Sequence, residues 1–170
     1  MRLIPPGPPA PVAIRRFGEL VDWTTVLLGG IIVVIVFVNV VFRFFDVEVA
    51  WTTELSEVLM VWVTFLGGAS AAQRAEHVAI IEFVDKLPPR ARKWGDAITQ
   101  LVCALVLVLL IWYGAGIARS GWTNRLTVLE WPMSVEYLAL PVGSAATLVF
   151  VLFDLVQIVR GRTRAERYGE

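Results

Sequence analysis

The sequence has few of the residues that usually carry chemistry, with one cysteine, Cys103, and one histidine, His77, among 170 residues. A lone cysteine forms no intrachain disulfide, and thiol exchange through a protein dithiol requires a cysteine pair. A lone histidine cannot supply both axial ligands of a bis-histidine haem or the imidazoles of a multi-histidine metal site. We therefore expect no disulfide oxidoreductase, no haem and no bound metal.

Charge of one sign is not in excess either, because 15 lysines and arginines balance 15 aspartates and glutamates. This balance provides no basic field that would hold a nucleic acid. The chain also lacks a glycine-rich phosphate-binding loop and a GxSxG nucleophile motif. The sequence thus predicts no nucleic-acid partner, no cofactor, no catalytic or substrate-binding residue and no enzymatic activity.

What the chain does contain is apolar length, with 57% hydrophobic residues. A helix needs about 20 residues to cross the hydrocarbon core of a bilayer. Four apolar runs are near that length, at about residues 20–42, 55–73, 97–118 and 134–159. We predict an all-α membrane protein with four transmembrane helices, and we expect Pro141 to kink the last helix or to displace its start. The first run exceeds the roughly 7–15 residues of a cleavable signal, so we expect it to be an uncleaved span.

Lysine and arginine are concentrated in three of the segments outside the apolar runs. The segment before the first run, the segment between the second and third, and the closing segment contain Arg2, Arg15, Arg16, Arg74, Lys86, Arg90, Arg92, Lys93, Arg160, Arg162, Arg164 and Arg167. The other two connections contain only Arg43, Arg119 and Arg125. Because cytoplasmic loops carry the excess of these residues, both termini are predicted to be cytoplasmic. The predicted organisation is a proline-rich tail (residues 1–18), a membrane domain (19–160) and a basic tail (161–170).

The connection between the second and third runs contains an apolar stretch that is too short to span a membrane. On a helix over about residues 77–87, one face would be apolar and the other charged, with Pro88-Pro89 ending the helix. Such an amphipathic helix lies in the headgroup plane of a bilayer. A strand over residues 78–81 is the alternative, but it would leave unpaired backbone groups at the membrane surface.

Glu54 and Glu57 lie three residues apart at the start of the second run and therefore share one side of a helix. Three interpretations are open. Acidic side chains complement the dipole at a helix N-terminus. They can instead pair with a cation on another subunit or with Arg43 at the outer end of the first run, since a charge at the hydrocarbon edge requires a partner. A relay for protons or cations is the third, although no further acid deep in the second or third run continues it.

Small and polar side chains within the runs indicate packing between helices. Gly67 and Gly68 each have an alanine four residues later, which lets another helix approach closely, and we expect that helix to belong to the same chain. Gln100 is placed to hydrogen-bond between helices, and Asp154 to snorkel or to pair with arginines of the closing tail.

Five of the seven tryptophans lie near predicted span ends, where amphipathic rings prefer the headgroup level: Trp23, Trp51, Trp94, Trp122 and Trp131. Trp62 and Trp112 lie deeper. Packing against another helix is the expected role of a tryptophan at that depth.

Three short segments together form a pattern. The first has a tryptophan followed by acidic residues, the second has a tryptophan before Phe-Leu-Gly, and the third has an arginine close to a histidine. They are Trp51-Thr52-Thr53-Glu54-Leu55-Ser56-Glu57, Trp62-Val63-Thr64-Phe65-Leu66-Gly67 and Arg74-Ala75-Glu76-His77-Val78. In this pattern the chain resembles the small membrane subunit (Q-type, DctQ-like) of TRAP transporters, the tripartite ATP-independent periplasmic transporters. The proline-rich start departs from the family pattern. The candidate subunit-interface or structural residues are Arg43, Trp51, Glu54, Glu57, Trp62, Gly67, Gly68, Arg74 and His77.

The resemblance implies a three-part secondary transporter of the bacterial inner membrane. Its other parts would be a large multi-helix membrane subunit and a periplasmic substrate-binding protein, with lipid around the membrane subunits. The small subunit would brace the large one and help dock the binding protein for ion-driven uptake of a solute, expected to be an organic acid. The outer loops around Asp46, Glu48 and Arg125 would be available for docking. The alternative hypothesis is a self-contained, homo-oligomeric small transporter that uses Glu54 or Glu57.

Overall fold

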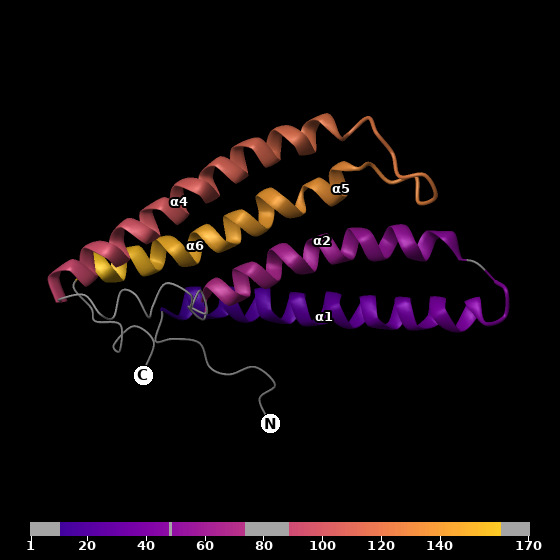
Figure 1. Ribbon diagram of the computed structural model, residues 1–170, viewed down its shortest axis with the longest axis horizontal. Coiled ribbons are helices and arrows are strands. Elements are labelled where there is room, and N and C mark those ends of the chain that lie inside the picture. The colour runs from indigo at the N-terminus through magenta and orange to yellow at the C-terminus, as the bar shows by residue number, and fades with distance from the viewer. Residues whose placement is uncertain (1–10, 48, 74–88, 161–170) are drawn as a thin grey trace, which may run out of the picture.

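The computed structural model describes residues 11–47, 49–73 and 89–160, with side chains from residue 94 onward in the last range. The helices in these ranges are α1 (Val12–Arg43), α2 (Ala50–Gln73), α4 (Pro89–Ser120), α5 (Ser134–Tyr137) and α6 (Ala139–Val159) (Figure 1). Four segments are long and apolar enough to cross a membrane: Val12–Arg43, Ala50–Gln73, Trp94–Ser120 and Ser134–Val159. The predicted all-α membrane fold is confirmed. The helix expected at about residues 77–87 lies outside the described residues, as do Arg74 and His77.

Helix α1 begins well before the apolar run that the sequence indicates. Its first residue, Val12, directly follows Pro11, which has the extended φ of −50° and ψ of 145°. From there Ile14 and Phe17 pack against the buried core, while Arg15 and Glu19 form an exposed ion pair one turn apart, with Nε and Oε1 separated by 3.8 Å. The first turns of α1 are therefore an amphipathic helix.

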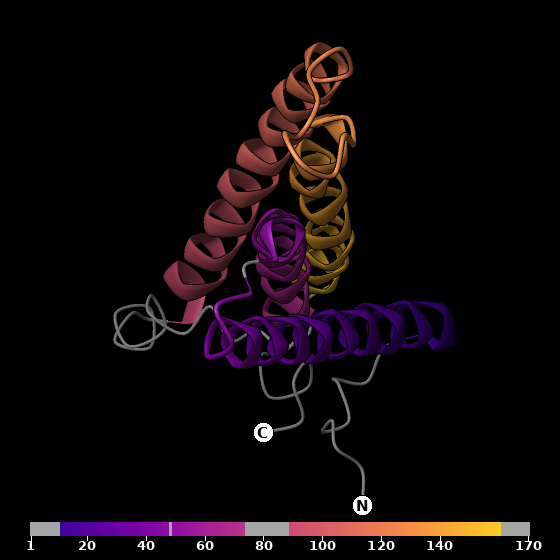
Figure 2. The ribbon, with the colours of Figure 1, turned by 90° about the vertical axis from the view of Figure 1, so that its right-hand side faces the viewer.

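The four spans form an open row in the order α1, α2, α6, α4. Helix α1 packs against α2, α2 against α6, and α6 against α4. In the described part of the chain, any contact of α4 with α1 or α2 is far smaller than these, so the row does not close into a bundle. Figure 2 shows α1 and α4 leaving the central pair in different directions. Both flanking helices consequently keep one long side uncovered.

The spans alternate in direction, which gives the row two distinct ends (Figure 1). At the end that we call the tail end, α1 and α4 begin and α2 and α6 end. At the other, the loop end, lie the connection from α1 to α2 and the connection over residues 121–133 from α4 to α5. The described chain therefore starts and finishes at the same end.

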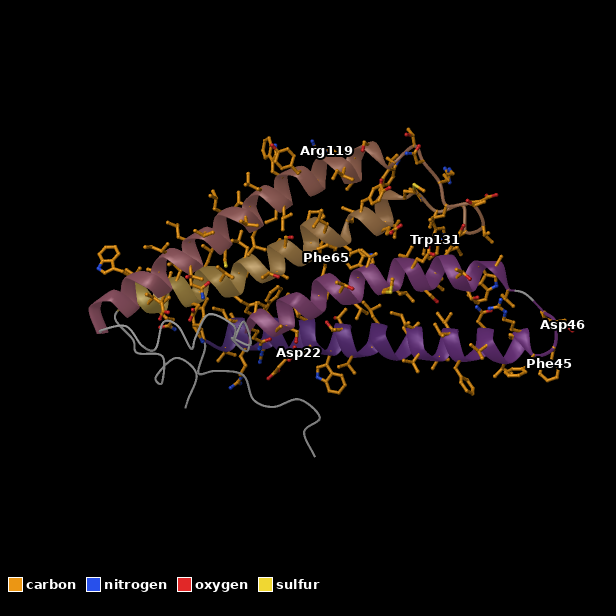
Figure 3. All side chains as sticks on the ribbon, in the orientation of Figure 1. Asp22, Phe45, Asp46, Phe65, Arg119 and Trp131 are labelled. Carbon is orange, nitrogen blue, oxygen red and sulfur yellow. The ribbon has the colours of Figure 1, made fainter. Side chains whose placement is uncertain are left out.

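The centre of the row is a close contact between α2 and α6. A buried cluster of Val21, Ala69, Ala146 and Phe150 joins α1, α2 and α6, and the rings of Phe17 and Phe150 lie 5.5 Å apart. Nearer the loop end, a Cβ on Gly143 would lie only 2.5 Å from the Cβ of Phe65. Phe65 lies between α2 and α6 in Figure 3. Only glycine at position 143 permits this approach of the two backbones.

The last span starts at Ser134, where the sequence predicts it, and Pro141 lies just after a one-residue break within it. Pro141 is the third residue of α6, and a single non-helical residue, Leu138, separates α6 from α5. Leu138 N donates to Ser134 O at 2.9 Å and Val142 N to Leu138 O at 3.1 Å. Proline has no N–H with which to continue the helical ladder between these two bonds. The break follows from that missing donor.

Candidate functional site

The carboxylate of Glu54 binds the backbone of the 121–133 connection. Val128 N lies 3.0 Å from both carboxylate oxygens, and Leu129 N donates to Oε2 at 2.8 Å. Glu54 is in the second turn of α2, so its side chain reaches from the loop end of the row to a segment more than 70 residues later. Charge-assisted hydrogen bonds of this kind are stronger than neutral ones. Glu54 therefore fastens the connection to α2.

The 121–133 connection is itself a hydrogen-bonded loop. Leu126 N donates to Trp131 O and Met133 N donates to Asn124 O, each at 2.9 Å, so that the two arms of the loop pair. At the tip, Arg125 Nη1 donates to Glu130 O at 2.8 Å, and Glu130 has a left-handed φ of 53°. These bonds and the Glu54 contact leave the tip little freedom. Trp122 and Trp131 remain 66% and 46% exposed beside it.

Two further contacts hold the base of this loop. The indole Nε1 of Trp62 donates to Val135 O at 3.0 Å, which joins α2 to α5. The hydroxyl of the fully buried Ser134 donates to Ala118 O at 2.5 Å, which joins α5 to α4. The contact of Trp62 with another helix is thus a hydrogen bond from its indole N–H.

Replacing Trp62 by phenylalanine is expected to lower the free energy of unfolding by about 1 kcal/mol. The ring would keep most of its packing, but Val135 O would lose its donor, and hydrogen bonds between membrane helices contribute on this order. The measurement is reversible unfolding in mixed micelles of SDS and a mild detergent. Trp112→Phe is the matched control, because Trp112 is 77% exposed and makes no hydrogen bond in the described chain. Equal losses in the two variants would contradict the role assigned to the indole N–H.

The other acidic and basic candidates at the loop end are not brought to Glu54. Glu57 and Trp51 are exposed on α2, and Arg43 is exposed in the last turn of α1. Among the described residues Arg43 pairs with neither glutamate, so the Arg43 alternative is not realised there. Two backbone N–H groups bind the Glu54 carboxylate instead of Arg43. Hydropathy and charge spacing carry no signal for such a partner, because every residue except proline has a backbone N–H.

At the tail end, polar side chains tie neighbouring helices together. Gln100 Nε2 of α4 donates to Asp154 Oδ2 of α6 at 2.7 Å, which confirms the interhelical hydrogen bond expected of Gln100. Of the arginines considered as partners of Asp154, Arg162, Arg164 and Arg167 lie outside the described residues. Ser70 of α2 donates to Asp22 of α1, and Asp22 is only 4% exposed. In Figure 3, Asp22 points from α1 toward α2.

Sequence reasoning overlooked Asp22 and Gly143. Asp22 follows Arg15, Arg16 and Glu19, so it resembles one more charge before a span, although it is buried inside α1. The feature of the sequence that could have indicated a buried Asp22 was Ser70, a hydrogen-bond donor in the small-residue run of α2. Gly143 lies in a comparable run, Gly143-Ser144-Ala145-Ala146, and that run could have been recognised by the same reasoning.

The two glycines that were recognised have different surroundings. A Cβ on Gly67 would lie 3.9 Å from Thr25 Cγ2 of α1, an ordinary contact within the chain. A Cβ on Gly68 would meet nothing within 4 Å. The intrachain packing expected of this pair is therefore seen at Gly67, while Gly68 is uncovered.

The polar contacts of these residues connect helices and a loop. The described ranges contain no group of three or more His, Cys, Asp or Glu side chains placed to hold a metal ion. The interhelical polar contacts in these ranges include single hydrogen bonds and one carboxylate that accepts from two backbone N–H groups. The class that emerges is a multi-pass membrane protein whose polar side chains hold four spans and one loop in place.

Comparison with known proteins identifies the family. Residues 32–161 match the family model of the tripartite ATP-independent periplasmic transporters, DctQ component. The match covers most of the chain, so this protein belongs to that family as a TRAP transporter small permease subunit. It is a non-enzymatic transport component.

Individual relatives support the same family. The sialic acid TRAP transporter small permease protein SiaQ of Vibrio cholerae is 37% identical over 122 residues, which cover 65% of this chain and 66% of SiaQ. The ectoine TRAP transporter small permease protein TeaB of Halomonas elongata is 25% identical over 127 residues, 73% of this chain and 66% of TeaB. A 106-residue match of 26% identity to the sialic acid TRAP transporter permease protein SiaT of Haemophilus influenzae covers 59% of this chain but only 17% of SiaT.

Proposed function

We propose that this subunit braces a large TRAP membrane subunit and presents the 121–133 loop to a periplasmic substrate-binding protein, for ion-driven uptake of a solute. In this proposal the tail end faces the cytoplasm of a bacterium and the loop end faces the periplasm. The charge distribution supports this orientation, because the lysine- and arginine-rich segments adjoin the tail end.

The open row of helices is the observation that carries the proposal. A transporter that works alone must enclose a path, whereas this row leaves α1 and α4 each uncovered along one side. The polar contacts stiffen the row and the loop instead of lining a passage between helices. SiaT supports the large partner, since in SiaT a segment similar to this chain is part of a much longer permease.

The alternative of a self-contained transporter that uses Glu54 or Glu57 is less well supported. The carboxylate of Glu54 is engaged by two backbone N–H groups, and Glu57 is exposed. A coupling acid has to exchange a proton or a cation during each cycle, and Glu54 could do so only by releasing the loop.

The proposed solute is an organic acid, chosen by the other two subunits. Related subunits belong to a sialic acid TRAP transporter, as SiaQ does, and to a C4-dicarboxylate TRAP transporter, as the DctQ of Rhodobacter capsulatus does.

Purification of the tagged chain from its native membrane in mild detergent, followed by mass spectrometry, tests the bracing role. We expect a large TRAP permease subunit to remain bound, and we expect vesicles that hold this chain alone to take up no organic acid. A stable homo-oligomer that transports by itself would overturn the proposal in favour of the self-contained transporter.

The docking role predicts an effect at Asp46, which lies at the tip of the α1–α2 connection with a φ of 56° (Figure 3). Asp46→Asn removes the charge and keeps a residue that tolerates this left-handed backbone. We expect it to weaken binding of the periplasmic protein to the assembled membrane complex by up to about fivefold, the size of one exposed ion pair. Glu19→Gln, an exposed charge at the tail end, is the control. Equal affinities for wild type and Asp46→Asn, measured by surface plasmon resonance, would remove Asp46 from the docking surface.

A further inference from the structure

The uncovered sides of the two flanking helices differ in chemistry. From residue 26 to residue 41, α1 has Asn39 as its only polar side chain, and exposed Val33, Val34 and Phe37 present hydrocarbon alone. Helix α4 instead exposes Trp112 by 77% and Tyr113 by 67%. In the described part of the chain neither of these two side chains makes a hydrogen bond. Lipid tails are a suitable surrounding for the α1 surface, but they offer no hydrogen-bond acceptor to the two aromatic side chains of α4.

Trp112 and Tyr113 lie too deep for the headgroup region. The span Trp94–Ser120 has its midpoint at residue 107, so Trp112 is about 7.5 Å from the middle at 1.5 Å rise per residue. The hydrocarbon core extends about 15 Å on each side of the middle. Trp94 and Trp122, near the two ends of the span, are the tryptophans placed for the interface. Anchoring in headgroups therefore does not explain the pair.

The backbone beside the pair is open. Gly116 follows Trp112 by four residues and Tyr113 by three, so all three share one face of α4, together with Leu109 one turn earlier. A Cβ on Gly116 would meet nothing within 4 Å. The opposite face of α4, with Ala104, Gly114 and Ala118, is the buried one that packs toward α6. An open glycine flanked by two aromatic donors can receive another helix at close range.

We propose that the α4 face formed by Leu109, Trp112, Tyr113 and Gly116 is where this subunit contacts a membrane helix of the large TRAP permease subunit, while the middle of α1 faces lipid. The partner helix packs over Gly116 and supplies hydrogen-bond acceptors to the indole N–H and the phenol O–H. SiaT indicates this occupant, because there the related segment is joined to a longer permease within one chain. The inference rests on the bracing function proposed above and specifies its surface.

Photo-crosslinking tests the assignment in membranes that contain this chain and its large TRAP permease subunit. A p-benzoyl-phenylalanine at Trp112 is expected to give a product of this chain with the large subunit, at a yield roughly tenfold above that from the same probe at Phe37, an exposed α1 position. A product with a second copy of this chain, or equal yields from the two positions, would overturn the assignment.

Substitution of the open glycine gives an independent test. Gly116→Leu is expected to reduce the amount of large subunit recovered with the tagged chain roughly tenfold, because the leucine blocks close approach. Gly30→Leu is the matched control, since Gly30 is an exposed glycine of α1 with nothing within 4 Å. A Cβ at either position meets nothing within 4 Å, so neither variant should unfold more readily than wild type. Unchanged recovery with Gly116→Leu would contradict the proposal.

The same experiments separate this inference from the proposed function. Suppose that the wild-type chain retains the large subunit, but the probe crosslinks to it from the position of Phe37 and not from that of Trp112. The bracing function then stands and the assignment of the α4 face is wrong. If wild type retains no large subunit at all, the bracing function itself fails.

Discussion

Gly143→Ala is expected to lower the free energy of unfolding by about 3 kcal/mol, although it adds a single methyl group. The new Cβ would lie 2.5 Å from Phe65 Cβ and 3.0 Å from the backbone C and O of Phe65. None of these atoms can move away by rotation of a side chain, so α2 and α6 must separate. Overpacking of a close contact costs about 1–3 kcal/mol, and the involvement of backbone places this site at the upper end.

Gly68→Ala is the control for that result. It introduces the same methyl group on α2, where a Cβ has nothing within 4 Å. Alanine is the better helix former by up to about 1 kcal/mol, so this variant should be as stable as wild type or slightly more stable. Unfolding in mixed micelles, followed by tryptophan fluorescence, measures both. Similar stability of the two variants would mean that α2 and α6 do not approach closely at Gly143.

The separation of α2 from α6 has a consequence beyond stability. These two helices are the middle of the row, and the contact between them joins the α1 flank to the α4 flank. A subunit with a loosened centre would no longer hold its uncovered sides at a fixed spacing. We therefore expect Gly143→Ala to retain less large subunit on purification than Gly68→Ala does.

Glu54→Ala is expected to release the 121–133 loop. The backbone N–H groups of Val128 and Leu129 would lose their carboxylate acceptor, and an unsatisfied group costs about 1–3 kcal/mol. Because Glu54 is partly exposed, water can replace part of this interaction, and we expect a loss near 1 kcal/mol. The sharper signal is hydrogen exchange, in which protection of the two amides should fall selectively.

Loss of the loop's fixed position should also impair transport if the loop receives the binding protein. We expect strongly reduced uptake by the complete transporter with Glu54→Ala and a smaller reduction with Glu54→Gln, whose amide oxygen can still accept from one or both N–H groups. Glu57→Ala is the matched control, since Glu57 is an exposed acid one turn away. If Glu57→Ala proves as harmful as Glu54→Ala, general loss of negative charge matters and the loop attachment does not.

The spans could be predicted because a bilayer imposes a local requirement. Each segment must satisfy its own backbone hydrogen bonds in lipid and must be apolar over about 20 residues, and both properties are visible in a window of sequence. The start of α1 at Val12 was less accessible, because residues 12–19 are amphipathic and lie outside the hydropathy peak. Pro141 could be interpreted from the sequence because its missing N–H affects only backbone hydrogen bonds within one helical turn.

The candidate site was only partly accessible. Gln100 was identified as an interhelical donor because a polar side chain inside a span requires a partner, but its acceptor, Asp154, could not be specified. Glu54 was recognised as notable, but none of the three interpretations left open for it named a backbone partner within this chain. Its true partners are backbone groups of a loop 74 and 75 residues away.

The sequence by itself determined the number of spans, their approximate positions and the family, because these depend on local hydropathy and short motifs. Only the tertiary structure decided that the helices stand in the order α1, α2, α6, α4, that Gly143 admits Phe65 and that Glu54 holds the 121–133 loop. The physical reason is that a membrane helix is apolar on all sides, so its hydrophobic pattern does not mark which side meets a neighbour. Neighbours are chosen by close fit and by a few hydrogen bonds between residues distant in the chain.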